Sequence, residues 1–172
     1  MAALGIVVAG SVVAAVIDLR TKRVPNELTM AMAGAGIVLA AMGGGRIGLT
    51  ASIAGCVLGA ALMLPGHLFG GTGAGDVKLL AASGALLGPS LTLRAFVATV
   101  IAGGLLALAV AWRRGRLRQT LDMTGQLALG NAASAAIRHP GADNRFAYAP
   151  AIALGVIVTV LGFRMWGFGF GV

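Results

Sequence analysis

The chain has 172 residues, enough for one domain, and 58% of them are hydrophobic while only 10% are charged. A typical soluble domain carries about 25% charged residues, so this composition excludes an ordinary water-soluble globule and makes lipid the solvent for much of the surface. The net charge of +8 suits nucleic-acid binding when taken alone. Basic residues also hold the loops of a membrane protein on its cytoplasmic side, so we expect a lipid bilayer as partner and no nucleic acid.

Six apolar segments approach the roughly 20 residues that a helix needs to cross ~30 Å of hydrocarbon. In chain order they are 2–17, 28–43, 49–69, 77–93, 95–112 and 147–166. They predict an all-α integral membrane protein, a bundle of about six transmembrane helices. We expect one membrane-embedded domain over residues 1–172, with residues 113–146 as its cytoplasmic loop.

The first segment, 2–17, has neither the basic start nor the small-residue cleavage site of a signal peptide and is interpreted as a retained span. Asp18 closes it, at the start of the basic stretch DLRTKR. Taken alone, Asp18 is compatible with a helix cap or a solvated loop charge. Pro25 and Asn26 follow in a turn that is expected to begin the second helix.

The third segment, which contains Pro65 and His67, ends in a run of glycines, GGTGAGDVK. Backbone exposed at membrane depth is costly unless it lines a wet cavity or meets another chain, and glycine lets another backbone approach closely. The fourth helix is expected to begin at Asp76 or Val77, where a carboxylate is favourable. A phosphate-binding loop is excluded, because no Gly-Lys-Ser/Thr follows and no strand precedes.

The positions of Lys and Arg predict the orientation. With residues 18–27 placed inside, ten basic residues lie inside and three, Arg46, Arg94 and Arg164, lie outside. This asymmetry predicts that both termini are outside and that the inner segments are 18–27, about 70–77 and 113–146. All five acidic residues lie in or beside those inner segments: Asp18, Glu27, Asp76, Asp122 and Asp143.

Asp18 and Asp76 are 58 positions apart, yet both fall at the inner ends of predicted spans. An ionisable residue at a helix break in the membrane is a candidate functional group. Two carboxyl groups ~3 Å apart share one proton. One of them can then activate water while the protonated partner polarises a carbonyl group. The pair therefore predicts the active site of an aspartic peptidase.

The motifs around both aspartates resemble those of the type IV prepilin peptidase family, the Gly-x-Gly-Asp aspartic peptidases. They are Asp18 with the downstream Val-Pro-Asn, and Gly-Ala-Gly-Asp-Val-Lys at residues 73–78. The chain is most similar to the short, peptidase-only members that serve Flp-type tight-adherence pili. Gly-x-Gly-Asp alone is a weak pattern, but the combination in a six-span chain is specific.

The resemblance implies that Asp18 and Asp76 are catalytic, with Gly73, Gly75, Lys78, Pro25 and Asn26 binding substrate or shaping the site. It implies removal of the leader peptide from prepilins or pseudopilins at the cytoplasmic face of the bacterial inner membrane, without a metal or other cofactor. Longer members have a loop with paired cysteines and also N-methylate the mature pilin. Because Cys56 is the only cysteine, neither methyltransferase activity nor a zinc site is expected.

Three side chains near the motifs have two readings each. Lys78 either orients or contacts the site, or it extends to lipid headgroups. His67 either touches the site or has a structural hydrogen bond. Tyr148 lies in FAYAPAIA, which is similar to the family's Pro-Tyr-Gly-type stretch but has Ala147 and Ala149 in place of Pro and Gly. Interfacial anchoring is the simpler reading of Tyr148.

Two other functions are compatible with the same residues. Carboxylates at helix breaks also bind protons or sodium in small ion-coupled transporters, although no inverted repeat is present here. A non-catalytic scaffold of a secretion system would need neither aspartate. Function that survives neutralisation of both aspartates would favour the scaffold.

Overall fold

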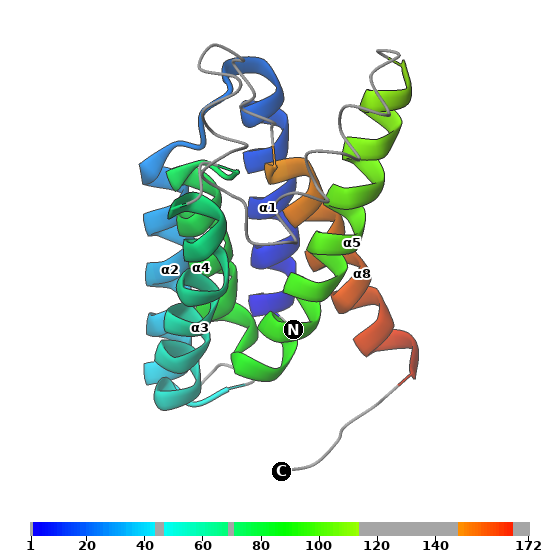
Figure 1. Cartoon of the computed structure of the whole chain (residues 1–172). Helices are drawn as coiled ribbons and strands as arrows, with labels where there is room; N and C mark the ends of the chain where they lie inside the picture. The colour runs from blue at the N-terminus through cyan, green and yellow to red at the C-terminus, as the bar shows by residue number, and fades with distance from the viewer. Residues whose placement is uncertain (1, 44–46, 69–70, 114–147, 167–172) are drawn as a thin grey trace.

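The computed structural model describes residues 2–43, 47–68, 71–113 and 148–166. These residues form six α-helices and no strand (Figure 1). The helices are α1 (Ala2–Thr21), α2 (Asn26–Ala41), α3 (Leu49–Leu68), α4 (Ala74–Leu87), α5 (Pro89–Arg113) and α8 (Ala149–Trp166). The protein is therefore all-α, as its apolar segments predicted.

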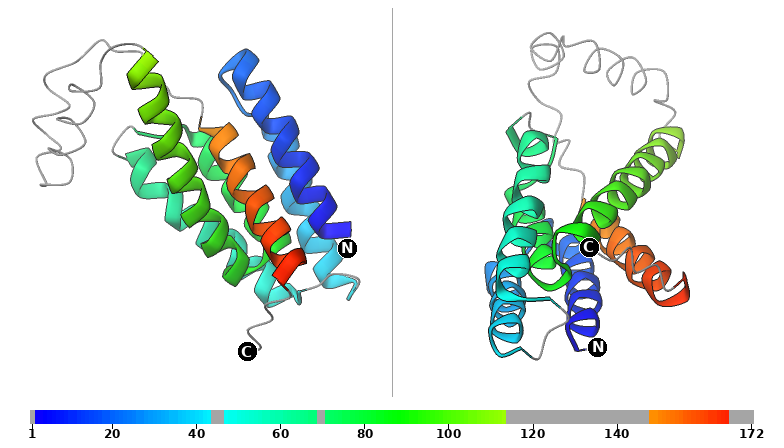
Figure 2. Two further views of the ribbon diagram at one scale, coloured as in Figure 1. Left: turned by 90° about the vertical axis from the view of Figure 1, so that its right-hand side faces the viewer. Right: turned by 90° about the horizontal axis from the view of Figure 1, so that it is seen from below.

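Successive helices run in opposite directions, so the start of α1 and the end of α8 lie at the same end of the bundle (Figures 1 and 2). The ends of α1, α3 and α5 meet the starts of α2, α4 and α8 at the opposite end, which we call the polar end. Asp18 lies in the last turns of α1 and Asp76 in the first turn of α4. Both aspartates therefore reach the polar end, as expected.

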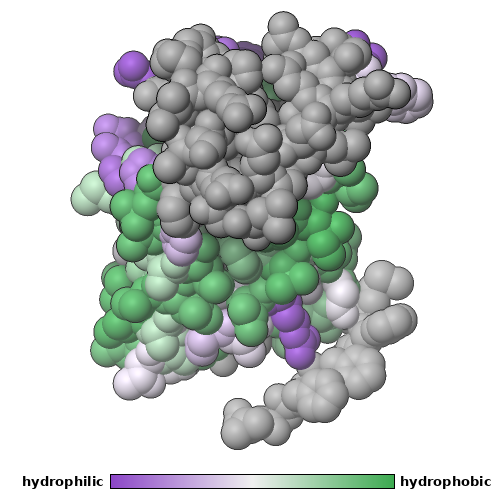
Figure 3. All heavy atoms as spheres, viewed as in Figure 1, coloured by the Kyte–Doolittle hydropathy of each residue, from purple (hydrophilic) through white to green (hydrophobic). Residues whose placement is uncertain are grey.

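Helix α4 is the centre of the bundle, because it packs against each of the other five helices described. Every residue from Ala82 to Gly88 is buried, and so are Leu79 and Leu80. The outer helices instead expose large apolar side chains, such as Val57, Ile101 and Leu161. Three helices, α1, α3 and α5, are long and apolar enough to cross a bilayer. On the face drawn in Figure 3, the part of the bundle that is not covered by grey atoms is mostly apolar.

Small residues allow the helices to approach closely. A Cβ atom on Gly84 would meet the backbone of Gly55, and one on Gly36 would lie 2.8 Å from the Ala85 carbonyl oxygen. Helices α2 and α3 therefore contact α4 at the level of the backbone. Not every helical glycine is packed in this way, since Cβ atoms on Gly34 and Gly104 would meet nothing within 4 Å.

The predicted boundary between the fourth and fifth spans was wrong. Helix α4 ends at Leu87, Gly88 follows with a positive φ of 77°, and Pro89 begins α5. Glycine after a helix and proline at the first helical position are ordinary punctuation. Arg94 is consequently a residue of α5, not of the connection before it. The apolar run across residues 77–112 concealed this break.

Other helix ends also differ from the prediction. Helix α1 extends to Thr21, so Asp18 lies within a helix rather than at its close. Helix α4 begins at Ala74, two residues before Asp76. Helix α2 begins and ends two residues before the predicted 28–43, although it starts directly after Pro25, in agreement with the predicted turn. The predicted loop 113–146 lies outside the described residues except for Arg113.

Candidate active site

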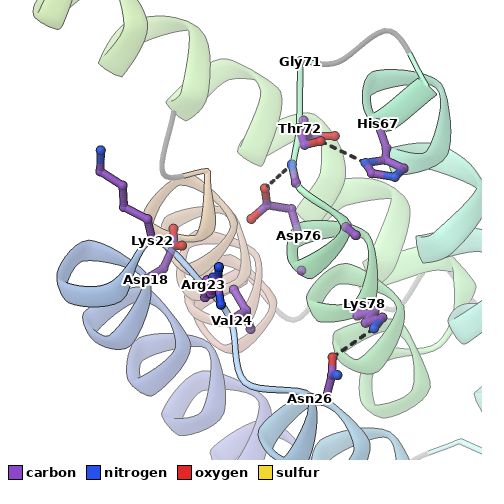
Figure 4. A pocket seen from close by; sticks show the side chains of 13 residues that line it. Asp18, Lys22, Arg23, Val24, Asn26, His67, Gly71, Thr72, Asp76 and Lys78 are labelled. Carbon is purple, nitrogen blue, oxygen red and sulfur yellow. Dashed lines mark hydrogen bonds between the residues drawn. The ribbon is translucent and has the colours of Figure 1, made fainter. Parts of the chain in front are cut away.

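A pocket of about 490 Å³ opens at the polar end, and both aspartates line it. Its walls come from three segments: the end of α1 with the connection to α2, the end of α3 with the following loop, and the start of α4 (Figure 4). The lining residues are Asp18, Lys22, Arg23, Val24, Asn26, His67, Gly71, Thr72, Gly73, Ala74, Gly75, Asp76 and Lys78. The pocket thus brings together residues far apart in sequence.

The Asp76 carboxyl group folds back over the first turn of α4. Its Oδ2 accepts a hydrogen bond of 2.9 Å from the backbone N–H of Gly73, the residue before the helix. Only 5% of the side chain is exposed. Burial raises the pKa of Asp76 to about 6, the Gly73 hydrogen bond opposes this change, and the charge of Asp18 adds to it. Asp76 can therefore hold a proton near neutral pH.

The two glycines before Asp76 make room for this geometry. A Cβ atom on Gly73 would lie 3.3 Å from Asp76 Oδ2, and one on Gly75 would lie 3.0 Å from the Cβ of Val24. Gly73 therefore accommodates the carboxyl group, and Gly75 accommodates the connection between α1 and α2. The spacing Gly-x-Gly-Asp has a direct steric explanation here.

The Asp18 carboxyl group reaches the start of α8. It accepts a hydrogen bond from the backbone N–H of Ala149, the first residue of that helix. Only 6% of the side chain is exposed, and Oδ2 is buried without a hydrogen-bond partner among the described residues. An unpaired buried carboxylate oxygen is costly. Asp18 therefore has one interaction that fixes its position and one oxygen left to interact with a ligand.

The remaining predicted site residues lie close by, with one exception. Lys78 Nζ donates a hydrogen bond of 2.9 Å to Asn26 Oδ1, which joins the start of α4 to the start of α2 (Figure 4). Lys78 thus has a protein partner, which the sequence did not predict. Pro25 does not line the pocket but precedes α2 with an extended backbone.

His67 fixes the loop between α3 and α4. Its Nδ1 lies 3.0 Å from the Thr72 carbonyl oxygen, and the N–H groups of Gly71 and Thr72 both donate to the Gly66 carbonyl. These contacts agree with a structural hydrogen bond for His67. The imidazole also lines the pocket, so contact with a bound ligand is compatible with the same position.

Sequence reasoning missed the role of the chain just before α8. Tyr148 is half-buried, and a Cβ atom on Gly103 would lie 2.6–2.9 Å from its phenol group. Burial raises the pKa of Tyr148, and the charge of Asp76 adds to this change. Tyr148 therefore lies between α5 and the site, rather than serving only as an interfacial anchor. The similarity of FAYAPAIA to the family's stretch was the available signal, but the sequence does not show that Tyr148 packs on Gly103.

Lys22 and Arg23, from the connection after α1, and Lys78, from α4, contribute cationic side chains to the pocket wall. In the parts of the chain that the structure describes, no three His, Cys, Asp or Glu residues are grouped so as to hold a metal ion. The two carboxyl groups and these basic side chains thus line one pocket.

The sequence matches the model of the type IV leader peptidase family over residues 5–108, a range that includes both aspartates. It is also 34% identical over 133 residues to proteins of two Burkholderia pseudomallei strains, 1026b and K96243, each named prepilin leader peptidase/N-methyltransferase. The aligned region is 69% of this chain and 40% of each relative, so the chain spans about two fifths of their length. No solved structure matches.

Proposed function

We propose, since this chain belongs to the type IV leader peptidase family, that it is a membrane aspartic endopeptidase that removes the leader peptide from type IV prepilins or pseudopilins. One observation carries the proposal: Asp18 and Asp76, from different helices, line one pocket at the polar end of an apolar bundle. The family membership supports the substrate class, and the paired carboxyl groups support the mechanism.

The reaction needs one ionised and one protonated carboxyl group. The ionised group takes a proton from water as the water oxygen bonds to the scissile carbonyl carbon, and the protonated group donates its proton to the carbonyl oxygen. The tetrahedral intermediate then collapses: the C–N bond breaks, and the leaving nitrogen receives a proton from the group that had accepted one. As the carbonyl group re-forms, the other carboxylate takes a proton back from a hydroxyl group of the intermediate. Both carboxyl groups return to their initial states, and no metal or other cofactor takes part.

The two aspartates suit different roles. The pKa of Asp76, raised to about 6, leaves roughly a tenth of this group protonated at pH 7, far more than of an ordinary aspartate, which suits the group that polarises the carbonyl. Asp18 has a backbone hydrogen bond and a free Oδ2, which suits the group that activates water. Because the two carboxyl groups interact, their titration belongs to the pair, and these roles describe the reactive protonation state.

The position of the pocket suits a substrate with one apolar and one polar part. An apolar helix of the precursor can pack in the bilayer beside the exposed side chains of the bundle, while its leader stays in water at the polar end. The scissile bond then meets the pocket at the boundary, where water reaches the carboxyl groups. We expect this boundary to face the cytoplasm of the bacterial inner membrane, because the basic residues gather there.

The finer specificity of the enzyme is also part of the proposal. The similarity to short family members supports Flp-like prepilins as substrates. The relatives from Burkholderia pseudomallei are named as bifunctional, but this chain has a single cysteine, Cys56, and no pair to build the cysteine-containing loop of the longer members. We propose that it cleaves without N-methylating the product.

The test is separate replacement of each aspartate by asparagine, which keeps the size of the side chain but cannot ionise. Purified Asp18→Asn and Asp76→Asn proteins are expected to lose at least about 10³-fold in cleavage of a Flp-type prepilin followed on a gel. Glu27→Gln is the control, because Glu27 is exposed at the same end but does not line the pocket. Normal processing by either asparagine variant would remove that residue from the mechanism.

Two further measurements separate this proposal from its alternatives. Cleavage is expected to continue in a metal chelator, whereas loss of activity that zinc restores would contradict the metal-free mechanism. Proteoliposomes that conduct protons or sodium through the wild-type protein, and lose this flux in Asp18→Asn, without prepilin cleavage would instead indicate an ion-coupled transporter.

A further inference from the structure

The start of α8 supplies the Asp18 carboxyl group with a backbone hydrogen bond, although Ala149 follows Asp18 by 131 positions in the sequence. The donor, Ala149 N–H, belongs to the first turn of a helix, where N–H groups have no partner within the helix. Ala149 is fully buried, and Ile152 N–H bonds the Tyr148 carbonyl oxygen, which closes that first turn. The position of this turn therefore determines where the Asp18 carboxyl group is held.

Tyr148 in turn determines the position of the first turn of α8. Its phenol group packs against Gly103 of α5 so closely that a Cβ atom there would lie 2.6 Å from the hydroxyl oxygen and 2.7 Å from Cζ. Real Cβ atoms essentially never show contacts under 3.0 Å, so a Cβ atom at this position would have to displace the ring. The neighbouring Gly104 is different, since a Cβ atom there would meet nothing within 4 Å.

We propose that Tyr148 is a positioning residue, whose ring seated on Gly103 fixes the start of α8 so that Ala149 N–H holds the Asp18 carboxyl group with Oδ2 free for the reaction. This inference rests on the proposed peptidase function. It adds a fourth element, the junction before α8, to a site otherwise formed by α1, the end of α3 and α4. Gly103 is part of it because a side chain there would displace the ring.

Adjacent glycines provide a matched test. Gly103→Ala and Gly104→Ala each add one methyl group at neighbouring positions of α5. Only the methyl group at position 103 overlaps the Tyr148 ring. Gly103→Ala is expected to lower kcat for prepilin cleavage about 10- to 100-fold, as small displacements of a catalytic group do, with KM changed less than about twofold. Gly104→Ala is expected to retain wild-type kcat and KM.

Substitution of Tyr148 distinguishes the ring from the hydroxyl group. Tyr148→Phe keeps the ring on Gly103 and is expected to retain most of the kcat, whereas Tyr148→Ala is expected to lose as much as Gly103→Ala. In the double variant Gly103→Ala/Tyr148→Ala the methyl group has no ring to displace, so its kcat should equal that of Tyr148→Ala alone. Multiplied losses in the double variant would mean that the two residues act separately and would overturn the proposal.

A second readout does not depend on cleavage. Amide hydrogen exchange at Ala149 in detergent micelles is expected to be slow in the wild type, and about tenfold faster or more in Gly103→Ala and in Asp18→Ala, but not in Gly104→Ala. If the wild type cleaves no prepilin but shows this exchange pattern, the peptidase assignment fails and the positional part stands. If it cleaves prepilin and Gly103→Ala has unchanged kcat and unchanged exchange, the positioning role fails while the function stands.

Discussion

Asp76 is buried and its carboxyl group accepts a backbone hydrogen bond from Gly73. Folding therefore changes how tightly this carboxyl group binds its proton. The Gly73 N–H stabilises the ionised form, but desolvation has the larger effect and moves the pKa from 3.8 to about 6. A buried carboxyl group in this state costs stability when it ionises. The same property that prepares Asp76 for catalysis therefore makes the fold sensitive to pH.

Replacing Asp76 by asparagine is expected to flatten the pH dependence of stability. The folded protein binds this proton more tightly than the unfolded chain, so the full stabilisation is present below about pH 4 and is lost as the pH rises through about 6. Across this window the free energy of unfolding should fall by at most about 3 kcal/mol in the wild type. Thermal unfolding in micelles at several pH values measures it.

Glu27→Gln provides the reference for that series, since Glu27 is exposed, and it should keep the wild-type dependence. Parallel stability curves for wild type and Asp76→Asn between pH 4 and 7 would show that Asp76 titrates at its ordinary value.

Gly75 is predicted to tolerate added volume poorly, because a Cβ atom there lies 3.0 Å from Val24 Cβ. Gly75→Ala should shift the connection between α1 and α2 by a few tenths of an ångström and reduce kcat by about tenfold. Gly75→Val should reduce it further. Gly5→Ala, which adds a methyl group in open space on α1, should cleave at the wild-type rate. Equal activity of the two Gly75 variants would argue against a steric cause.

At the scale of helices, α3 and α4 approach each other so closely that their backbones are in contact. A Cβ atom on Gly84 would collide with the Gly55 backbone, and one on Gly59 would lie 2.5 Å from the Leu80 carbonyl oxygen. Neither neighbour is the end of a flexible side chain, so neither can move without displacing a helix. The Ser52 hydroxyl adds a 2.7 Å hydrogen bond to the Ala85 carbonyl oxygen across the same interface.

Gly84→Ala is therefore expected to destabilise the protein by about 1–3 kcal/mol or more, the usual cost of overpacking. Gly34→Ala is the matched control, since Gly34 lies in α2 with open space around it and alanine favours the helix. Unfolding in detergent, followed by circular dichroism, measures both. A Gly84→Ala protein as stable as Gly34→Ala would mean that α3 and α4 are farther apart than the structure places them.

The number and type of the six described helices could be predicted from hydropathy, but their ends could not. Residues 79–93 carry no charged side chain, so the positive φ of Gly88, which follows α4, left no mark in the hydropathy. Gly88-Pro89 was the available signal, and it was outweighed by the length expected of a span. The turn before α2 was predictable because Pro25 restricts the backbone there.

At the scale of the whole molecule, most of the described basic residues and all of the described acids support one orientation. Arg20, Lys22, Arg23, Lys78 and Arg113 belong to the polar end, together with Asp18, Glu27 and Asp76, whereas Arg94 and Arg164 belong to the opposite end. If this end faces the cytoplasm, a single cysteine at Arg20 should resist a membrane-impermeant maleimide in intact spheroplasts, and one at Met42 should react. Both substitutions are made in a Cys56→Ala background.

Met42 is suited to this measurement because it is 78% exposed at the other end of α2. Both cysteines should react once the membrane is permeabilised, which controls for accessibility. Labelling of the Arg20 position alone in intact cells would reverse the orientation and place the pocket outside.

Local sequence motifs could predict most of the expected pocket residues, but not the contacts that fix the positions of those residues. Asp18, Asp76, Gly73, Gly75, Asn26 and Lys78 were all singled out from their neighbours in sequence, and all line the pocket. The contacts of Tyr148 with Gly103 and of Ala149 with Asp18 join segments with no shared motif. Only the packing of α8 between α1 and α5 brings them together.

The glycine contacts differ between helix pairs: some helices meet through backbone atoms, whereas α1 meets α2 through a side chain. Helices α2, α3 and α4 touch through backbone atoms, and α5 and α8 do so where a Cβ atom on Gly155 would lie 2.7 Å from the Ala95 carbonyl oxygen. Helix α1 meets α2 through the pliable thioether of Met32 beside Gly10, and its Asp18 is tied to α8. The two acids thus belong to α1 and α4, which none of these backbone-level glycine contacts joins directly. A small inhibitor that binds both carboxyl groups would connect α1 to α4. Its binding would be detected as a rise in melting temperature even with no substrate present.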